Sequence, residues 1–335
     1  MTITDHPFAE FVRALGKGPN MWRDLSFEEA KEAMGMILMD QVDPLQLGAF
    51  LLLLRRKGET PEELAGMAAA AKLNFAPGKQ IRENDVDYDW PSYADRHRQQ
   101  PWFILSAILL ADQGHTILMH GIEGYAEGYA PTRPALKLFG IPELSSLDDA
   151  PAVFRESSLN YIGLEKFCPA LQKLFELRPF LGVRTAVNTF ARDLNPLNAS
   201  CQMQGVFHPP YIPLHLKTAQ LLGQEQAMIF KGGGGEVQRN PMKKGRVAWL
   251  QGEQSEELLW PALSEISTYK WREEDLDPVQ LLKMWKGEIT LPVPEQAIIG
   301  TLAVALKMKN KSASLEALDR QAREIWMSRD KKRFS

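Results

Sequence analysis

The sequence of 335 residues has little cysteine, no paired histidines and no long hydrophobic run, and each absence excludes a class of protein. Its two cysteines, Cys168 and Cys201, rule out a disulfide scaffold or a cysteine-rich zinc module. Its six histidines include no pair at i and i+4, which excludes the common helical His-pair metal site. The longest apolar run, 102–111, is about half of the ~18 residues that a membrane helix needs. The first ten residues carry two acids and no basic stretch, so we expect no secretory signal and a soluble, cytoplasmic protein.

A large net charge is also missing, but the charges are distributed unevenly. The chain has 39 Lys and Arg against 42 Asp and Glu, a net charge of −3, which argues against a polycation that binds nucleic acid by composition alone. Residues 151–250 nevertheless carry 12 basic and 6 acidic side chains, a net of +6, and the rest of the chain carries −9. This excess indicates either a basic surface in the middle of the chain or a chance scatter of solvated charges.

The first 74 residues predict four short helices, because each candidate start has a capping side chain or a proline just inside it. The starts are Asp5 to Pro7, Ser26 with Glu29, Asp43-Pro44 and Thr60-Pro61, and glycines at 16 and 58 end the first and third helices. The third helix is apolar around nearly its whole circumference between 45 and 54, so we expect its own domain or a partner subunit to bury it. Met34, Met36 and Met39 add apolar surface to the second helix. We therefore predict a homodimer built on these helices, with core packing inside the chain as the alternative.

The pattern of apolar residues changes after Pro77-Gly78, and from there helical segments alternate with short apolar strands. We expect helices at 101–113, 135–139, 294–308 and 314–327, and strands at 116–120, 153–154, 227–230 and 246–250. This alternation predicts an α/β domain with a mostly parallel sheet.

Three blocks of sequence resemble the glycosyltransferase family 3 proteins, the group of anthranilate phosphoribosyltransferase and pyrimidine-nucleoside phosphorylase. They are 56–63, 181–188 followed by Asn195-Pro196, and His120-Gly121 at the end of a strand, and they occur in the family order. The resemblance implies the nucleoside phosphorylase/phosphoribosyltransferase-like fold, with a small all-helical domain and a large α/β domain. The helical domain would take 1–75 plus inserted helices at about 163–182, and the α/β domain 76–162 and 183–335. It also implies a homodimer joined through the helical domain.

The chemistry of the family is altered in this chain. The transferases hold phosphoribosyl pyrophosphate against the bare amides of a Gly-Thr-Gly-Gly-Asp turn, whereas the matching stretch, 89–96, has no glycine and contains Pro91. The family's Lys-His-Gly-Asn is 119–122 here and has lost its lysine and asparagine, and only Glu236 remains near the place of the magnesium-binding acids. We therefore predict no catalytic residue and no metal ligand. Magnesium and phosphoribosyl pyrophosphate would be cofactors only of a transferase. The resemblance places the former substrate cleft at Ser92, His120, Gly121, Arg178 and Asn188.

Two positions of this region have alternative interpretations. Arg178 matches the arginine that contacts the aromatic acceptor in the transferases, and it serves here either a ligand or a structural salt bridge. Cys168-Pro169 stands where the transferases carry His-Pro, and we expect Cys168 to be a small buried residue rather than a reactive thiol.

The replacements resemble one branch of the family, the anthranilate-phosphoribosyltransferase-like paralogues of proteobacteria that bind nucleic acid and lack transferase activity. The matching segments are 91–93, 167–169 and 232–237 with Asn240-Pro241. The resemblance implies non-specific binding of DNA and RNA, single strands included, along a basic groove of the dimer. The candidate nucleic-acid or anion-binding residues are Arg96, Arg98, Lys166, Lys173, Arg178, Arg184, Arg192, Lys231, Gly233, Gly234, Arg239, Lys243, Lys244 and Arg246.

Other interpretations stay open at this point. The glycine run 232–235 is either a loop that brings amides to a phosphate or a turn between strands. Trp90 and Tyr93 are candidates for base stacking, whereas we expect Trp102 in the core. The acidic run 273–275 is most simply a solvated face. The alternative functions are a phosphoribosyltransferase or phosphorylase with a rewired site, such as the anthranilate phosphoribosyltransferase of tryptophan synthesis, and a structural dimer that binds a small anion.

Overall fold

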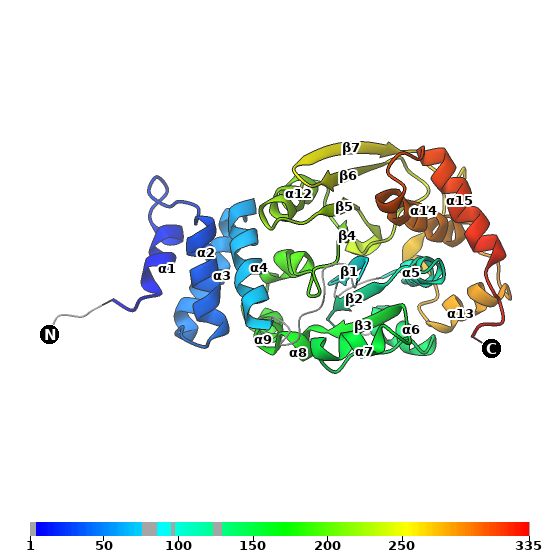
Figure 1. Ribbon diagram of the computed structural model, residues 1–335. Coiled ribbons are helices and arrows are strands. Elements are labelled where there is room, and N and C mark those ends of the chain that lie inside the picture. Colours follow the sequence, from blue (N-terminus) through cyan, green and yellow to red (C-terminus); the bar gives the residue numbers. More distant parts are fainter. Residues whose placement is uncertain (1–4, 76–85, 95–97, 123–128, 335) are drawn as a thin grey trace.

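The computed structural model describes residues 5–75, 86–94, 98–122 and 129–334, and it places a small helical domain beside a larger α/β domain (Figure 1). The helical domain contains α1 (Ala9–Gly16), α2 (Phe27–Leu38), α3 (Pro44–Lys57) and α4 (Pro61–Phe75). The predicted caps are present: Ser26 and Glu29 form a reciprocal capping box on α2, and Asp43 accepts from the Leu45 amide at the start of α3. The four predicted helices are therefore confirmed.

The α/β domain is built on one seven-stranded sheet with the order β3-β2-β1-β4-β5-β6-β7. The strands are β1 (Tyr88–Ser92), β2 (Ile117–Gly121), β3 (Leu159–Gly163), β4 (Cys201–Val206), β5 (Gln226–Lys231), β6 (Gly245–Gln251) and β7 (Gln254–Trp260). The pairs among β1 to β5 are parallel, and β6 and β7 add an antiparallel edge. The prediction of a mostly parallel sheet is confirmed. The carboxyl ends of β1 to β5 share one edge, which is where α/β folds usually bind ligands.

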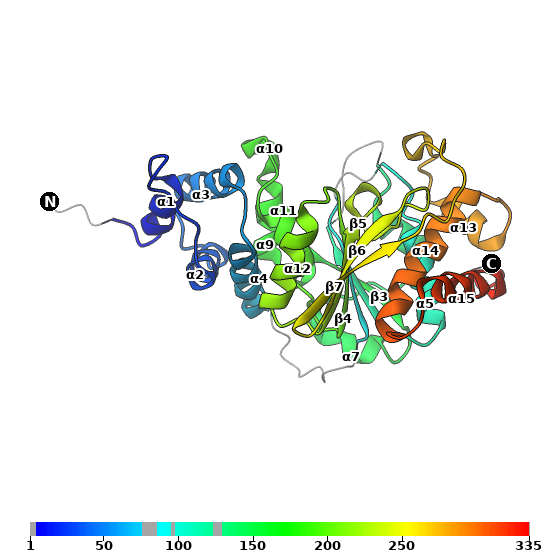
Figure 2. The ribbon, with the colours of Figure 1, turned by 90° about the horizontal axis from the view of Figure 1, so that it is seen from above.

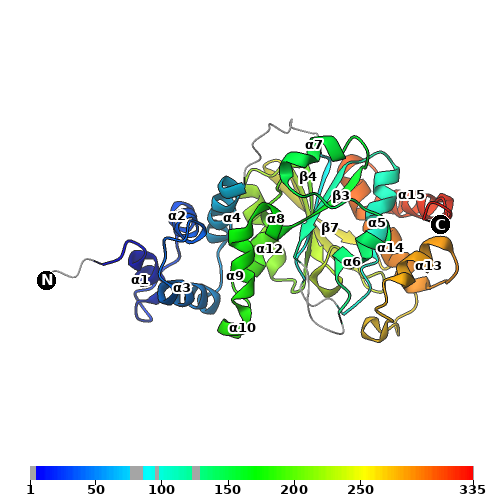
Figure 3. The ribbon, with the colours of Figure 1, turned by 90° about the horizontal axis from the view of Figure 1, so that it is seen from below.

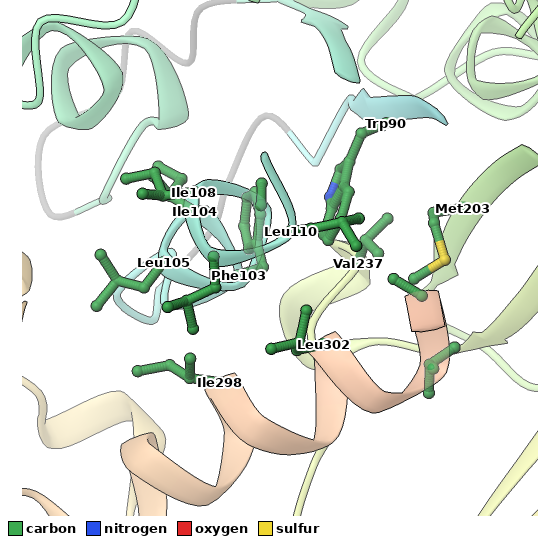
Figure 4. Packing of buried hydrophobic residues seen from close by; sticks show 14 of the residues in the cluster. Trp90, Phe103, Ile104, Leu105, Ile108, Leu110, Met203, Val237, Ile298 and Leu302 are labelled. Carbon is green, nitrogen blue, oxygen red and sulfur yellow. The ribbon is translucent and has the colours of Figure 1, made fainter. Parts of the chain in front are cut away.

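Helices cover both faces of the sheet (Figure 2). On one face lie α5 (Phe103–Asp112), α14 (Pro292–Lys309) and α15 (Leu315–Ser328), joined by α6 (Thr132–Leu138) and α13 (Val279–Lys286). Ile104 and Leu105 of α5 and Ile298 and Leu302 of α14 belong to one buried cluster, with Trp90 of β1 beside them (Figure 4). Alternate residues of the strands enter this cluster because side chains of a strand point to opposite faces in turn.

The opposite face joins the α/β domain to the helical domain. It carries α8 (Leu164–Phe167), α9 (Pro169–Glu176), α10 (Arg178–Leu181), α11 (Val187–Phe190) and α12 (Tyr211–Leu221), with α7 (Ala150–Val153) at the rim. Figure 3 shows α9 and α10 running between the sheet and helices α3 and α4. Leu171 and Leu174 of α9 share a buried cluster with Phe50 and Leu54 of α3. In the described part of the chain, no helix is both long and apolar enough to cross a membrane.

The helix α3 is less buried within this chain than its apolar sequence suggests. Only Phe50, Leu51 and Leu54 of its 14 residues are buried, and the side chain of Leu45 is 84% exposed. Met34 of α2 is buried, but Met39 is largely exposed. The intrachain core therefore covers only one side of α3.

One local expectation is wrong and another holds only in part. The segment 153–154 was expected to be a strand, but Val153 ends α7, because Pro151 in its first turn fits a helix start and 150–153 continues a 3-10 turn, η1 (Leu147–Asp149). The run 273–275 is not wholly solvated. The Glu274 carboxylate accepts from the amide of Gln100 and from the indole N–H of Trp102, each at 2.8 Å. Burial raises the pKa of Glu274.

Candidate functional site

A cavity of about 470 Å³ opens at the carboxyl edge of the sheet, between the end of β5 and the start of β6. We call it the β5–β6 pocket. Seven basic side chains line it: Arg98, Lys231, Arg239, Lys243, Lys244, Arg246 and Arg272. Among the described residues, no Asp or Glu lines the cavity. A concave surface with charges of one sign concentrates ligands of the opposite sign, so this pocket suits an anion.

The glycine-rich loop forms one wall of the β5–β6 pocket but donates most of its amides internally. The amides of Gly232, Gly233 and Gly235 donate to carbonyls of the protein at 2.9, 2.7 and 3.2 Å. A Cβ at Gly232 would lie 1.6 Å from the carbonyl oxygen of Glu236, so only glycine lets the chain cross itself here. Gly234 and Gly235 adopt positive φ of 66° and 95°. The backbone therefore packs tightly against itself in this loop, and we expect side chains rather than the loop amides to contact an anion.

Five of the predicted basic residues are exposed at this pocket, Arg98 and four that lie on or near β5 and β6. Lys231 ends β5, Lys243 and Lys244 lie in the loop before β6, and Arg246 is the second residue of β6. The Arg246 guanidinium lies 3.6 Å from the Glu257 carboxylate, in a pair whose side chains are both more than half exposed. Such an exposed ion pair contributes little to stability, so a phosphate can take the place of the Glu257 carboxylate beside Arg246. These four side chains are the strongest candidates for anion contacts.

Arg98 and Arg239 line the same pocket in different states. Arg98 is exposed, donates to the Tyr129 hydroxyl at 3.1 Å, and stacks 5.2 Å from the centre of that ring. Arg239 is only 3% exposed. Its guanidinium pairs with Asp319 at 3.2 Å and donates to the carbonyl of Pro261. Burial lowers the pKa of Arg239 to about 10. We therefore retain Arg98 as a candidate contact and assign Arg239 a structural role.

A second, smaller cavity of about 120 Å³ lies where α3 meets α12. We call it the α3–α12 pocket, and it is lined by Arg55, Arg184, Thr185, Asn188, Thr189, Arg192, Val206, Phe207, His208, Tyr211 and His215. Arg55 of the helical domain donates to the Tyr211 hydroxyl of the α/β domain at 3.2 Å. This lining also holds no carboxylate among the residues that the structure describes.

Arg192 and Asn188 hold the backbone of this smaller pocket together. The Arg192 guanidinium donates to the carbonyl of Gly205 and, at 3.5 Å, to that of Asn188. Burial lowers the pKa of Arg192. The Asn188 side-chain oxygen accepts from the amide of Thr185 at 3.0 Å. Both residues thus act in the fold, whereas Arg184 is exposed at the rim.

Phe207 lines both pockets. It follows directly after β4, and 52% of it is exposed. The His208 ring meets the Phe207 ring edge-on, with 4.7 Å between their centres. Sequence reasoning missed Phe207, together with Arg55, Tyr129, His208 and Arg272. Only Phe207 has a recognisable signal, an aromatic residue that follows a strand and precedes His-Pro-Pro.

Three residues of the former substrate cleft, Ser92, His120 and Gly121 at the ends of β1 and β2, are closed within the protein. Ser92, at the end of β1, is buried and shares a 2.8 Å hydrogen bond with Thr132. His120 is fully buried, with its Nε2 3.0 Å from Asp89 and its Nδ1 2.8 Å from the Tyr93 hydroxyl. A Cβ at Gly121 would lie 1.9 Å from the Ser92 carbonyl oxygen. Backbone and side chains therefore fill this part of the sheet edge.

This closed region extends as a chain of hydrogen bonds across the sheet. Gln202 donates to Asp89 at 2.8 Å, and Gln204 donates to Gln202 and to Asp193, each at 2.8 Å. Asp193 in turn lies 2.9 Å from Nδ1 of His215. The chain thus connects the buried His120 to the wall of the α3–α12 pocket.

The aromatic candidates of this region belong to the core. Trp90 is fully buried and Tyr93 nearly so, and burial raises the pKa of Tyr93. The expectation that they stack on bases is wrong, because neither ring reaches the surface. Trp102 and Cys168 are buried as predicted. Burial raises the pKa of the Cys168 thiol to about 11.

The remaining candidates lie elsewhere. Lys166 and Lys173 are exposed on α8 and α9, and Arg178 is half-buried at the start of α10; none of the three lines either pocket. Arg96 lies outside the described residues. Glu236 is buried and accepts from the Ala94 amide at 2.8 Å. Among the residues that the structure describes, no three His, Cys, Asp or Glu side chains gather into a possible metal site.

Comparisons of the sequence and of the structure with known proteins agree on the family and on the fold. Residues 9–72 match the helical bundle domain of a glycosyl transferase family, and residues 104–322 match its α/β domain. An uncharacterised protein of Aquifex aeolicus is 31% identical over 244 residues, 72% of each chain. The fold is similar to anthranilate phosphoribosyltransferase of Thermus thermophilus, with a TM-score of 0.79, 21% identity, and coverage of 97% of this chain and 95% of that one. The Saccharomyces cerevisiae enzyme in complex with PRPP and Mg has a TM-score of 0.75, 18% identity, and coverage of 97% and 94%.

Proposed function

The chain belongs to glycosyl transferase family 3, and we propose that it is a member that binds DNA and RNA without sequence preference and does not transfer phosphoribose. One observation carries this proposal. The two cavities at the open sheet edge are lined by basic side chains, and no carboxylate lines either of them among the described residues. Nucleic acids offer a matching row of phosphates.

The type of contact supports binding that does not depend on sequence. Lys231, Lys243, Lys244 and Arg246 come from one loop and two strands, not from a helix that could enter a major groove. Contacts of this kind position a phosphate backbone and carry no information on the bases. Each one releases counterions, so affinity should fall steeply with salt.

The closed sheet edge argues against phosphoribosyl transfer. Phosphoribosyl pyrophosphate needs several exposed amides at the end of β1, where Pro91 has no N–H and the Ser92 carbonyl abuts Gly121. A magnesium ion at pyrophosphate needs carboxylate ligands, and Glu236 is held by the Ala94 amide. The described residues therefore fit neither group.

We also propose that the chain forms a homodimer through its helical domain. In the described residues, fourteen large hydrophobic side chains are exposed, and six of them lie in the first 75 residues, Leu45, Leu52 and Leu73 among them. Exposed large hydrophobic side chains that gather in one region often mark an interface. The variant L45E/L52E should be monomeric by light scattering at micromolar concentration, whereas the parent should have twice the mass of the chain. A monomeric parent would contradict the dimer.

The test of the function is a titration of the full chain with a labelled mixed-sequence single strand at several salt concentrations. We expect log affinity to fall linearly with log salt, with a slope of roughly 0.7 per phosphate contact. A second strand of different sequence should give the same curve. The transferase alternative would be supported instead by tight binding of phosphoribosyl pyrophosphate with magnesium and no binding of the strand.

A further inference from the structure

We propose that Phe207 is a base-stacking residue of a single-strand site that spans the β5–β6 and α3–α12 pockets; this inference rests on the proposed function. Phe207 lines both pockets, and 52% of it is exposed. It is therefore an aromatic surface set between two groups of cations, Lys231, Lys243, Lys244 and Arg246 on one side and Arg55 and Arg184 on the other.

Neighbouring residues pack against the Phe207 ring although it is half exposed. A Cβ added at Gly235 would lie 3.4 Å from the Cβ of Phe207. The absence of a side chain at Gly235 therefore lets Phe207 lie close to the glycine-rich loop. The neighbouring His208 ring packs edge-on against it. Phenylalanine has only two side-chain torsions, so a braced ring loses little freedom when a ligand covers it. The site is thus prepared for stacking before a ligand binds.

The chemistry of the surroundings selects a single-stranded nucleic acid as the ligand. Every base has a π-face, so stacking on an aromatic ring tolerates any sequence. Bases in a duplex are already stacked and paired, and their faces do not reach a surface ring. In a single strand, successive phosphates can bind the cations of the two pockets while the base between them covers Phe207. An apolar protein partner would gain nothing from the basic side chains on both sides.

The experiment separates the base from the phosphates. The full-length parent and F207L are titrated, at one fixed salt concentration, with a 12-nucleotide thymidine strand, with a strand of equal length and charge made of abasic units, and with a 12-base-pair duplex. The parent should bind the thymidine strand about 10-fold more tightly than the abasic strand. F207L should lose this preference, while its affinity for the abasic strand and for the duplex stays unchanged.

Matched variants exclude a general defect. F207Y keeps a ring and should retain the preference. F180L removes the same atoms from a phenylalanine that is 87% exposed and lines neither pocket, and it should also retain the preference. If F207L still prefers the thymidine strand, or if it loses affinity for all three ligands alike, the stacking role is overturned while the proposed function stands. If the parent binds none of the three ligands, the proposed function and this inference both fail.

Discussion

The two halves of the sheet's carboxyl edge differ in whether their polar side chains are buried or face an open cavity. Over β1 and β2, the side chains of Asp89, Tyr93 and His120 are buried, and His120 shares a hydrogen bond with Tyr93 and lies 3.0 Å from Asp89. Over β4, β5 and β6, the basic side chains of the β5–β6 pocket face an open cavity. The same edge of one sheet is thus closed at one end and open at the other. One edge of a sheet can therefore be filled by buried polar groups at β1 and carry an open, basic cavity at β5.

The closure also explains why the charges of the two halves behave differently. A buried charge is tolerated only when partners satisfy it, and Asp89 has both His120 and Gln202 within hydrogen-bond distance. An exposed lysine remains hydrated and can exchange water for phosphate. Polar residues of the closed half should therefore affect stability, and those of the open half should affect binding.

The largest effect that we expect is a complete absence of phosphoribosyl transfer to anthranilate. Among its described residues, the closed half offers neither the amides nor the exposed acids for the reaction, and losing even one electrostatic donor group in an active site costs ~100-fold or more. The measurement is complementation of a tryptophan auxotroph that lacks the authentic transferase, with that enzyme as the positive control. Growth supported by this chain would contradict this prediction, because the closed half would then be catalytic.

The next effect is on stability. The variant D89A leaves His120 and Gln202 without their buried partner, and breaking such a pair costs about 3–5 kcal/mol. The free energy of unfolding in urea is the measurement, and the affinity for a single strand should stay unchanged wherever the variant is folded. As a control, E265A removes a carboxylate at an exposed position and should change the stability by less than ~0.5 kcal/mol. Equal stability of D89A and the parent would show that this network does not hold the edge closed.

A binding effect of roughly 100-fold should follow from reversing charge in the open half. The variant K243E/K244E/R246E removes three candidate phosphate contacts, so the salt slope on single strands should fall by about 2 and all sequences should weaken alike. The control is K311E/K331E/K332E, which changes the net charge equally at exposed positions that line neither pocket. If the first variant binds as well as the parent, or if the control weakens binding equally, the β5–β6 pocket is not the site.

The sequence predicted local features well because their causes are local. The caps at Ser26 and Asp43 define their helices through neighbouring residues, and the cations at 243–246 are close in the chain as well as in space. Strands with polar buried positions were missed. Gln202 and Gln204 break the apolar pattern of β4, and they are buried because the network across the sheet satisfies them.

Contributions from distant segments could not be predicted from the sequence. Arg55, Phe207 and Tyr211 meet only after the helical domain packs on α12. The structural roles of Arg192 and Arg239 depend on backbone carbonyls and on Asp319, which no spacing in the sequence reveals. Charge alone therefore also selects arginines that bond within the fold, and burial separates these from the exposed arginines that remain candidates for contacts.

The smallest effect concerns Cys168, whose buried thiol lies 3.8 Å from the side-chain oxygen of Asn74. Its pKa of about 11 lies above the ordinary value of 9, so at pH 8 the reactive thiolate should be about 100-fold rarer in the folded chain than in the unfolded one. The measurement is the rate of labelling by a maleimide in a C201A background, compared between native conditions and guanidinium. A native rate close to the denatured rate would mean that the closed half opens readily.

The same shift makes a prediction about pH and stability, since a raised pKa favours the folded state only while the thiol keeps its proton. Below pH 9 both states are protonated, and the contribution of Cys168 is fully present. Between pH 9 and 11 the unfolded chain loses the proton first, so stability should decline over that window and the contribution should be lost as the pH passes the folded value. The variant C168A should lack this part of the decline, seen as a smaller drop in the free energy of unfolding from pH 9 to 11 than in the parent. Equal drops in the two proteins would show that the thiol is not shielded, and the closed half would then be as open to solvent as the pocket beside β5.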